Sequence, residues 1–449
     1  MIFTRNRNPE DMSESARADW HPDPPAGDQP ARGHARQTLA PPRFAIAATD
    51  DASDAAEGLH EGTPARARLA LADTLSASQP VTSRDHFSGR HDVLGALIAA
   101  IEQQRAHVVL YGERGIGKTS LVHVFAQTAR DAQYVVLYGS CGANTQFDEL
   151  FRTFAAEIPL LYHAEVSPTG DETKHGGSFA DLLGNAPITP RRLADLFTKL
   201  VGTRVIVVLD EYDRVADTGF RRAIAELIKN LSDRAARMQL VLTGVASNLD
   251  ELIGFTPSIR RNIVGIAVSG MPDAELGEIL ARAENASGMT FTTSARMLII
   301  RMADGSPYLT RLLGNRAAGR ALDGRRLSIV NDDVIAGTEA VLAEWNAGLP
   351  RHVQSLLQRP QVRAVWNTLI AAARASGTPD GWFGVHDVVV DDARDNAPGT
   401  AAILDSLTGE IDLLDQRTDP DTRQPRYRFR AQGVAQLLGL SAALARAER

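Results

Sequence analysis

The chain is poor in cysteine, in lysine and in long apolar runs, and each shortage excludes a class of protein. Its 449 residues include a single cysteine, Cys141, which excludes an intramolecular disulfide and favours a reducing compartment. No apolar run reaches the ~18 residues that a membrane-spanning helix needs. The first residues, Met1 to Pro9, are too polar for a signal peptide. We therefore expect a cytoplasmic protein with no membrane partner.

Lysine is so scarce that almost all positive charge comes from arginine, which makes Lys118 conspicuous. The net charge of −7 at pH 7 argues against nucleic-acid binding by the molecule as a whole. Any contact with DNA would need a local basic patch. The chain is 44% hydrophobic and 23% charged, as is usual for a globular protein, and its length predicts two or three domains.

One stretch matches every fixed position of a phosphate-binding loop, G-x-x-x-x-G-K-[ST]. An apolar run from Val108 to Tyr111 predicts a buried strand before it, and a helical pattern from Ser120 to Ala129 follows it. A chance glycine-rich turn is the alternative, but it would not need strand, loop and helix in this order. The predicted nucleotide-binding residues of the loop are Gly112, Glu113, Arg114, Gly115, Ile116, Gly117, Lys118, Thr119 and Ser120.

The chemistry of this loop explains its spacing. Glycines let the backbone turn tightly enough for its N–H groups to surround a polyphosphate. The following helix points its positive N-terminal end at the same phosphates. We expect Lys118 to reach the β- and γ-phosphates of ATP and the Thr119 hydroxyl to bind Mg²⁺.

A second motif has the pattern called Walker B, an apolar strand that ends in two carboxylates. The strand is predicted from Val205 to Leu209, and Asp210 and Glu211 follow it. Asp210 is expected to hold Mg²⁺ through water, and Glu211 to polarise the water that attacks the γ-phosphate. The alternative is a buried strand with solvated acids at its end; Asp213 is interpreted in that way, as a loop acid or a helix cap.

Five short apolar strands alternate with helical segments, which predicts an α/β fold with a parallel sheet. After the fourth strand, Thr243, Ser247 and Asn248 are candidates to contact the γ-phosphate, although turn capping explains them equally well. Arg260 and Arg261 precede the fifth strand and serve either as an arginine finger for a neighbouring subunit or as surface ion-pair partners. The predicted strands are 108–111, 134–138, 205–209, 240–244 and 263–268.

Composition divides the chain into four segments. Residues 1–82 hold nine of the 22 prolines and show little periodicity, so we expect a mostly disordered tail, with at most a short helix near 65–75. Residues 83–270 form the predicted core with the phosphate loop. Residues 271–346 are helical throughout and predict a lid, with Asn331 as the N-cap of its last helix. Residues 347–449 combine helices with one hairpin, which predicts a winged-helix-like domain.

The predicted hairpin is rich in arginine. A basic wing from Arg423 to Arg430 could contact the phosphates of double-stranded DNA. The same arginines could form a solvated strand face, and the domain could bind a protein partner or a second copy of the chain. The arginines on or beside the hairpin are Arg417, Arg423, Arg426, Arg428 and Arg430.

Taken in order, these motifs resemble those of AAA+ and STAND P-loop ATPases, and most of all the origin-recognition-like bacterial ATPases. The resemblance spans residues 85–440. It rests on Phe87-x-Gly89-Arg90, then GERGIGKTS, VIVVLDEYD, LTGVASNLDEL, SIRRN, a helical lid with Gly305-Ser306-Pro307, and the winged helix.

The resemblance implies roles for single residues. Arg90 lies near the adenine pocket, Ser247 or Asn248 is the sensor 1 residue, and Pro307 contacts the nucleotide. Where such lids usually carry a sensor 2 arginine, this chain has Tyr308, and Arg311 one turn later is a possible substitute. Lack of that arginine favours a conformational switch that binds ATP and hydrolyses it slowly, and it argues against a ring motor. The switch could be associated with DNA, or it could act on a protein, as STAND regulators do.

Overall fold

The computed structural model describes residues 64–167, 176–246, 248–253, 257–378, 381–390, 397–419 and 422–447. Most of the predicted N-terminal tail, residues 1–63, lies outside these ranges. So does Ser247, one of the predicted sensor 1 residues.

A five-stranded parallel sheet forms the core, in the order β2-β3-β4-β1-β5, and it contains all five predicted strands. β1 lies between β4 and β5, with Val109 paired to Leu242 on one side and to Gly265 on the other. The predicted fold class, an α/β P-loop core, is confirmed. The strands are β1 His107–Gly112, β2 Val135–Ser140, β3 Val205–Asp210, β4 Met238–Val245 and β5 Ile263–Ala267.

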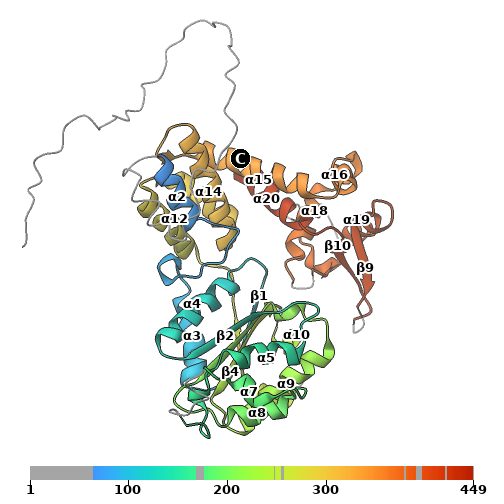
Figure 1. Cartoon of the computed structure of the whole chain (residues 1–449). Coiled ribbons are helices and arrows are strands. Elements are labelled where there is room, and N and C mark those ends of the chain that lie inside the picture. The colour runs from blue at the N-terminus through green and yellow to red at the C-terminus, as the bar shows by residue number, and fades with distance from the viewer. Residues whose placement is uncertain are drawn as a thin grey trace, which may run out of the picture.

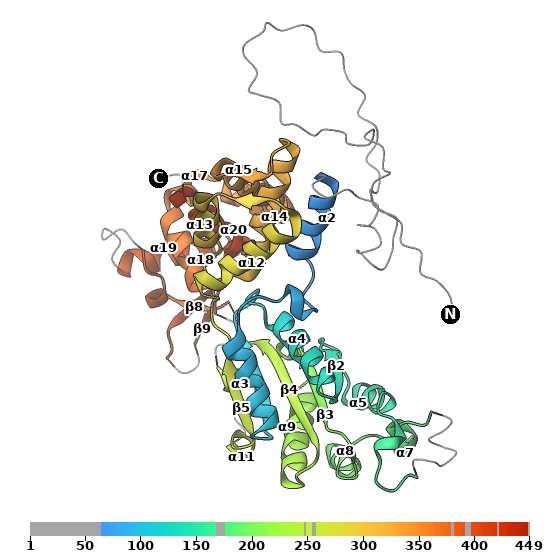
Figure 2. The same ribbon diagram turned by 90° about the vertical axis from the view of Figure 1, so that its left-hand side faces the viewer.

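Helices cover both faces of this sheet because alternate strand residues point to opposite sides. In β1, Val108 and Leu110 pack with α3 and α4, whereas Val109 packs into a second core with α5, α8 and α9 (Figure 2). α8 has Thr189 at its N-cap and Pro190 as its first residue, and the Thr189 hydroxyl accepts the N–H of Arg192. The helices are α3 His91–Glu102, α4 Lys118–Asp131, α5 Phe147–Ala156, α7 Phe179–Leu183, α8 Pro190–Phe197, α9 Thr218–Asp233, α10 Leu249–Ile253 and α11 Pro257–Arg260.

Four helices and a short parallel strand pair, β6 Thr290–Phe291 with β7 Ser328–Ile329, form the lid above the sheet (Figure 1). One detail of its prediction is wrong: Asn331 is the first residue of α15, and Val330 holds the N-cap position. Extended backbone at Val330 places the helix start one residue earlier than the polar side chain suggests. The lid helices are α12 Asp273–Ser287, α13 Thr293–Ala303, α14 Pro307–Asp323 and α15 Asn331–Gly348.

The end of the predicted tail is folded: the short helix allowed near residues 65–75 is present as α2, and the expectation of a disordered tail is corrected for residues 64–82. Helix α2, Pro64–Thr74, packs on α12 and α14, and Leu71 and Leu75 are buried in the core of the lid (Figure 2). The chain then runs back to the sheet as a strap, residues 75–90, and Val81 joins the core beside α4. A helix of 11 residues is marginal alone, so its own sequence carries little signal; the lid stabilises it.

The C-terminal domain has the predicted helices and hairpin. Its antiparallel sheet has the order β8-β10-β9, with Tyr427 opposite Gln416. Two of its helices, α17 and α18, are separated at Val365, whose ψ of 23° interrupts the helical backbone. α20 also reaches the lid core with Leu440 and Leu444. The elements are α16 Arg351–Leu357, α17 Pro360–Ala364, α18 Trp366–Ala375, β8 Phe383–Gly384, α19 Ala397–Gly409, β9 Leu414–Thr418, β10 Pro425–Phe429 and α20 Val434–Ala447.

Within the described ranges, the structure contains no helix of the length and apolarity that crossing a membrane requires.

The buried strap leads to a stability prediction. Leu75, the first residue of the strap, is fully buried against Gly314 of α14, so Leu75→Ala leaves a cavity in the lid core. We expect it to lower the free energy of unfolding of the lid by about 2–5 kcal/mol, measured by chemical denaturation. The matched control is Leu182→Ala, because Leu182 is 39% exposed. Equal stability of the two variants would contradict the placement of α2 and the strap.

Candidate active site

The loop between β1 and α4 has a shape that only glycine allows at its critical points. Gly115 and Gly117 have φ angles of 77° and 94°, in the left-handed region. A Cβ on Gly112 would lie 2.3 Å from the carbonyl oxygen of Val268, so a side chain there would collide with the backbone after β5. The loop therefore curls tightly in front of the N-terminus of α4, where backbone N–H groups can bind an anion.

Lys118 lies inside this curl. Its Nζ donates to the carbonyl oxygens of Gly112 at 2.8 Å and Glu113 at 2.6 Å, and the side chain is buried. Burial lowers the pKa of Lys118 to about 8, although Asp213 and Asp210 act against this shift. The loop thus holds a desolvated ammonium group where a polyphosphate would lie.

Asp210 is buried at the end of β3 and accepts three hydrogen bonds. Tyr138 of β2 donates its hydroxyl to Oδ2 at 2.7 Å. The hydroxyl of Thr243 and the N–H of Glu211, the latter at 2.9 Å, donate to Oδ1. These three hydrogen bonds fix the orientation of the Asp210 carboxylate at the edge of the sheet.

Glu211, the next residue, has different surroundings. Its φ of 53° turns the chain out of β3, and its side chain is 44% exposed. Oε2 accepts hydrogen bonds from Ser140 Oγ at 3.1 Å and from Arg214 Nη1 at 2.7 Å. The two neighbouring carboxylates are therefore separated into a buried one and an exposed one.

The side chains at this edge fit Mg²⁺ better than a metal held by protein alone. In the part of the chain that the structure describes, no group of three or more His, Cys, Asp and Glu residues could hold a metal. Mg²⁺ commonly uses one or two protein oxygens, and phosphates and waters fill the other positions. The Thr119 hydroxyl and the Asp210 carboxylate match that need.

Asp213 has a larger part in the site than its interpretation as a loop acid or helix cap suggests. Its Oδ1 accepts the N–H of Val245 at 2.9 Å, and a Cβ on Gly244 would lie only 3.0 Å from that oxygen. Among the charges that raise the pKa of Lys118, that of Asp213 comes first. Its position three residues after Asp210, on the turn that returns towards the sheet, is the signal that could have identified it.

The lid and the strap reach the phosphate loop from above. Arg90, at φ 58°, is buried and donates from Nη2 to the Ile116 carbonyl at 3.1 Å, and its backbone N–H donates to Oε2 of Glu275 in α12 at 3.1 Å. Pro307 starts α14 directly over the loop: a Cβ on Gly117 would lie 3.5 Å from its Cγ. The structure thus brings Arg90 and Pro307 to the loop.

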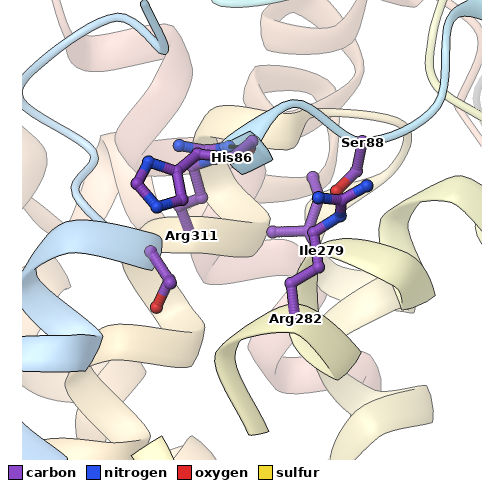
Figure 3. A pocket seen from close by; sticks show the side chains of 6 residues that line it. His86, Ser88, Ile279, Arg282 and Arg311 are labelled. Atoms are coloured by element: carbon purple, nitrogen blue, oxygen red, sulfur yellow. Dashed lines mark hydrogen bonds between the residues drawn. The ribbon is translucent and has the colours of Figure 1, made fainter. Parts of the chain in front are cut away.

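Arg311, the possible substitute for a sensor 2 arginine, takes another direction. It is buried, and its Nη2 donates to the carbonyl of His86 in the strap at 3.2 Å. It lines a small pocket between α2, the strap, α12 and α14, where the hydroxyl of Ser88 is buried without a hydrogen-bond partner (Figure 3). The other lining residues are Thr74, Ile279 and Arg282. Arg311 therefore joins strap and lid and does not reach the loop.

Arg260 and Arg261 lie at the opposite edge of the sheet. They precede β5, whose first residue, Ile263, pairs with His107 at the amino end of β1. The phosphate loop follows the carboxyl end of β1, a strand length of roughly 15–20 Å away. Arg261 is 76% exposed and lies 4.0 Å from Asp233. Neither arginine can serve the nucleotide site of its own chain.

The arginines of the C-terminal hairpin are largely paired within the domain. Arg417 and Arg428 both lie over the Trp382 ring, with their guanidinium carbons 4.3 and 4.7 Å from its centre. The remaining pairs join neighbouring acids: Arg426 with Asp419, Arg428 with Asp415, and Arg430 with both Asp412 and Asp415. The hairpin is therefore less basic than its arginine content alone indicates.

The chain was compared with known proteins. A Walker-type ATPase of Pyrococcus abyssi has a similar fold, with 16% identity, 81% of this chain and 99% of the other covered, and a TM-score of 0.47. Cdc6p of Pyrobaculum aerophilum has 16% identity, 84% and 99% of the two chains covered, and a TM-score of 0.43. The RuvB Holliday junction branch migration motor of Thermotoga maritima has 17% identity, 78% and 95% of the two chains covered, and a TM-score of 0.40. Similarity at this level says nothing about what the present chain binds. No curated protein matches the sequence.

The sequence profile of a known domain family matches the segment that carries the loop and the two carboxylates. The family is described as AAA ATPase domain, and the match covers residues 86–242, from the strap to β4. Both predicted motifs lie inside it, in the order and geometry given above. Residues 86–242 of this chain are an AAA ATPase domain, as the motifs predicted.

Proposed function

We propose that the chain is an ATP-dependent conformational switch in which MgATP binds between the sheet and the lid. One observation carries the proposal: the lid contacts the phosphate loop and the strap at three separate points. These are Pro307 over Gly117, Glu275 bonded to Arg90, and Arg311 bonded to His86. A ligand that changes the loop or the strap must therefore act on the lid.

ATP would bind with its phosphates in the loop. Lys118 would exchange one or both backbone carbonyls for phosphate oxygens, which are stronger acceptors because they are charged. Thr119 and Asp210 would hold Mg²⁺, which neutralises phosphate charge during transfer. Arg90 and Pro307 lie beside the loop and would flank the rest of the nucleotide.

Hydrolysis is the activity of an AAA ATPase domain, and Glu211 is the residue best placed to orient the attacking water. In the present arrangement Ser140 and Arg214 occupy its carboxylate. An exposed ion pair of this kind contributes ~0–1 kcal/mol, so ATP or a partner can displace it at little cost. Turnover would be slow as long as Glu211 is held in this way.

Two features connect the site with possible partners. Arg260 and Arg261, at the far edge of the sheet, would reach phosphates only on a second copy of the chain, which supports self-association as part of the switch. In the C-terminal domain, a Cβ on Gly377 would lie 3.7 Å from Oε1 of Glu113 in the phosphate loop. This contact supports transfer of the nucleotide state to the C-terminal domain.

A cytoplasmic location of the protein stays a prediction.

The hairpin could act on duplex DNA or on a protein. The ion pairs with Asp412, Asp415 and Asp419 leave less charge for phosphates, and phosphate contacts are what DNA affinity depends on. We therefore favour a protein partner, as in STAND-type regulators, and keep DNA as the second candidate.

The switch predicts a separable effect of Glu211→Gln. ATP turnover should fall by about 10²–10⁴-fold, because the water loses its base, while ATP affinity stays within a few-fold. Bound ATP should then persist and increase protection of α12 and α14 from hydrogen exchange. Asp217→Asn is the matched control, because Asp217 caps α9 nearby without touching the site. Unchanged exchange of the lid with bound ATP would contradict the switch.

The pKa of Lys118 predicts how ATP binding depends on pH. The free protein loses this charge as the pH rises through about 8, and phosphate binding needs the protonated form. The Kd for ATP should therefore increase by up to about tenfold per pH unit above 8, as measured by calorimetry. Lys118→Arg should bind more weakly but without this dependence, because arginine stays charged. Equal wild-type affinity at pH 7 and pH 10 would refute the assignment.

DNA binding can be tested directly on the hairpin. We expect duplex DNA to show no salt-sensitive binding to the wild type with ATP or with ADP, measured by fluorescence anisotropy at several salt concentrations. Arg426→Ala with Arg428→Ala serves as the test variant. Its charge-matched control is Arg68→Ala with Arg316→Ala, two exposed arginines of α2 and α14. Salt-sensitive binding that only the hairpin variant loses would establish DNA as the partner.

A further inference from the structure

The carboxylate of Asp210 is held from both neighbouring strands. β3 lies between β2 and β4 in the sheet, and each neighbour contributes one hydroxyl, from Tyr138 and from Thr243. Oδ1 has two donors, the Thr243 hydroxyl and the N–H of Glu211. Within the part of the chain that the structure describes, Oδ2 has one, the Tyr138 hydroxyl at 2.7 Å. A carboxylate oxygen can accept two hydrogen bonds, so Oδ2 keeps one position for a further donor.

The phenol ring of Tyr138 is fixed separately from its hydroxyl. It stacks on the imidazole of His123, with ring centres 4.5 Å apart and an angle of 28° between the planes. His123 is in α4, four residues after Thr119, so both side chains lie on the same face of that helix. Tyr138 therefore connects the helix that carries Thr119 with the strand that carries Asp210.

The hydroxyl of Tyr138 is the donor that the sheet supplies to Oδ2 of Asp210. The bond cannot be replaced from within the sheet, because Thr243 and the Glu211 N–H are both on the other oxygen. Loss of the hydroxyl would leave Oδ2 without this donor, while Oδ1 keeps its bonds to Thr243 and to the Glu211 N–H.

We propose that Tyr138 is a positioning residue for magnesium: its hydroxyl holds Asp210 so that Oδ2 can accept a hydrogen bond from a water on Mg²⁺. Side chains that orient a metal-supporting residue from outside typically change metal affinity by about 10–100-fold when they are removed. The inference rests on the proposed MgATP site and adds the residue that sets how strongly this site uses the metal.

The test compares nucleotide affinity with and without metal, using the full chain and a non-hydrolysable ATP analogue. For each variant, the Kd is measured by calorimetry in EDTA and at a series of Mg²⁺ concentrations up to a large excess, and its dependence on Mg²⁺ isolates the contribution of the metal. For Tyr138→Phe we expect the Kd in EDTA to stay within about twofold, and the Mg²⁺ concentration for half-maximal effect to rise by about 10–100-fold. Tyr134→Phe, four residues earlier beside the same strand, should behave like the wild type.

A second variant keeps the inference testable if Tyr138→Phe does not fold. His123→Leu retains the hydroxyl of Tyr138 but removes the ring on which it stacks, and it should raise the Mg²⁺ requirement in the same direction by a smaller factor. His123 is only half-buried, so this change is easier to accommodate.

Two results would overturn the role of Tyr138 while leaving the nucleotide site intact. One is an unchanged Mg²⁺ dependence in Tyr138→Phe. The other is an equal loss of affinity in Mg²⁺ and in EDTA, which would indicate a structural effect only. Absence of nucleotide binding by the wild type in both conditions would overturn the site itself, and the inference with it.

Discussion

The site depends on the parallel arrangement of the five strands. Because all strands run in the same direction, their carboxyl ends meet at one edge, and the residues at or just after those ends come together there. β1 supplies the phosphate loop, β3 the two carboxylates, β2 the side chains of Tyr138 and Ser140, and β4 that of Thr243. Lys118 is buried and desolvated at this edge, so its charge is available to a phosphate at short range.

The phosphate loop and the five strands could be predicted from the sequence because each is marked by residues that lie close together in the chain. The glycine loop needs particular φ angles within a few residues, and five short apolar runs mark five buried strands. The family profile over residues 86–242 confirms the AAA-type ATPase domain that these motifs predicted. Lys118, Thr119, Asp210 and Glu211 could be named for the same reason, since each lies at a fixed distance from such a run.

The features that the sequence did not reveal depend on contacts between distant segments. The sequence allowed a short helix near residues 65–75, but the packing of α2 on the lid depends on helices that lie far along the chain. Arg311 lies close to the expected lid position, but its direction is decided by the carbonyl of His86 in the strap. The arginines of the hairpin indicate a basic wing until their pairing with neighbouring aspartates is seen. How much arginine charge remains for a ligand depends on which arginines lie beside an aspartate in the folded hairpin, and composition alone does not give this.

Helix α20 has a mechanical consequence. Its first half packs in the core of the C-terminal domain, at Val434 and Leu438, and its second half in the core of the lid, at Leu440 and Leu444. A 14-residue helix is about 21 Å long and stiff against bending. α20 is therefore anchored in both the lid and the C-terminal domain (Figure 1). A rotation of the lid that keeps α20 straight would move the hairpin with it. Small shifts beside the phosphates would thus become large displacements at the far end of the molecule.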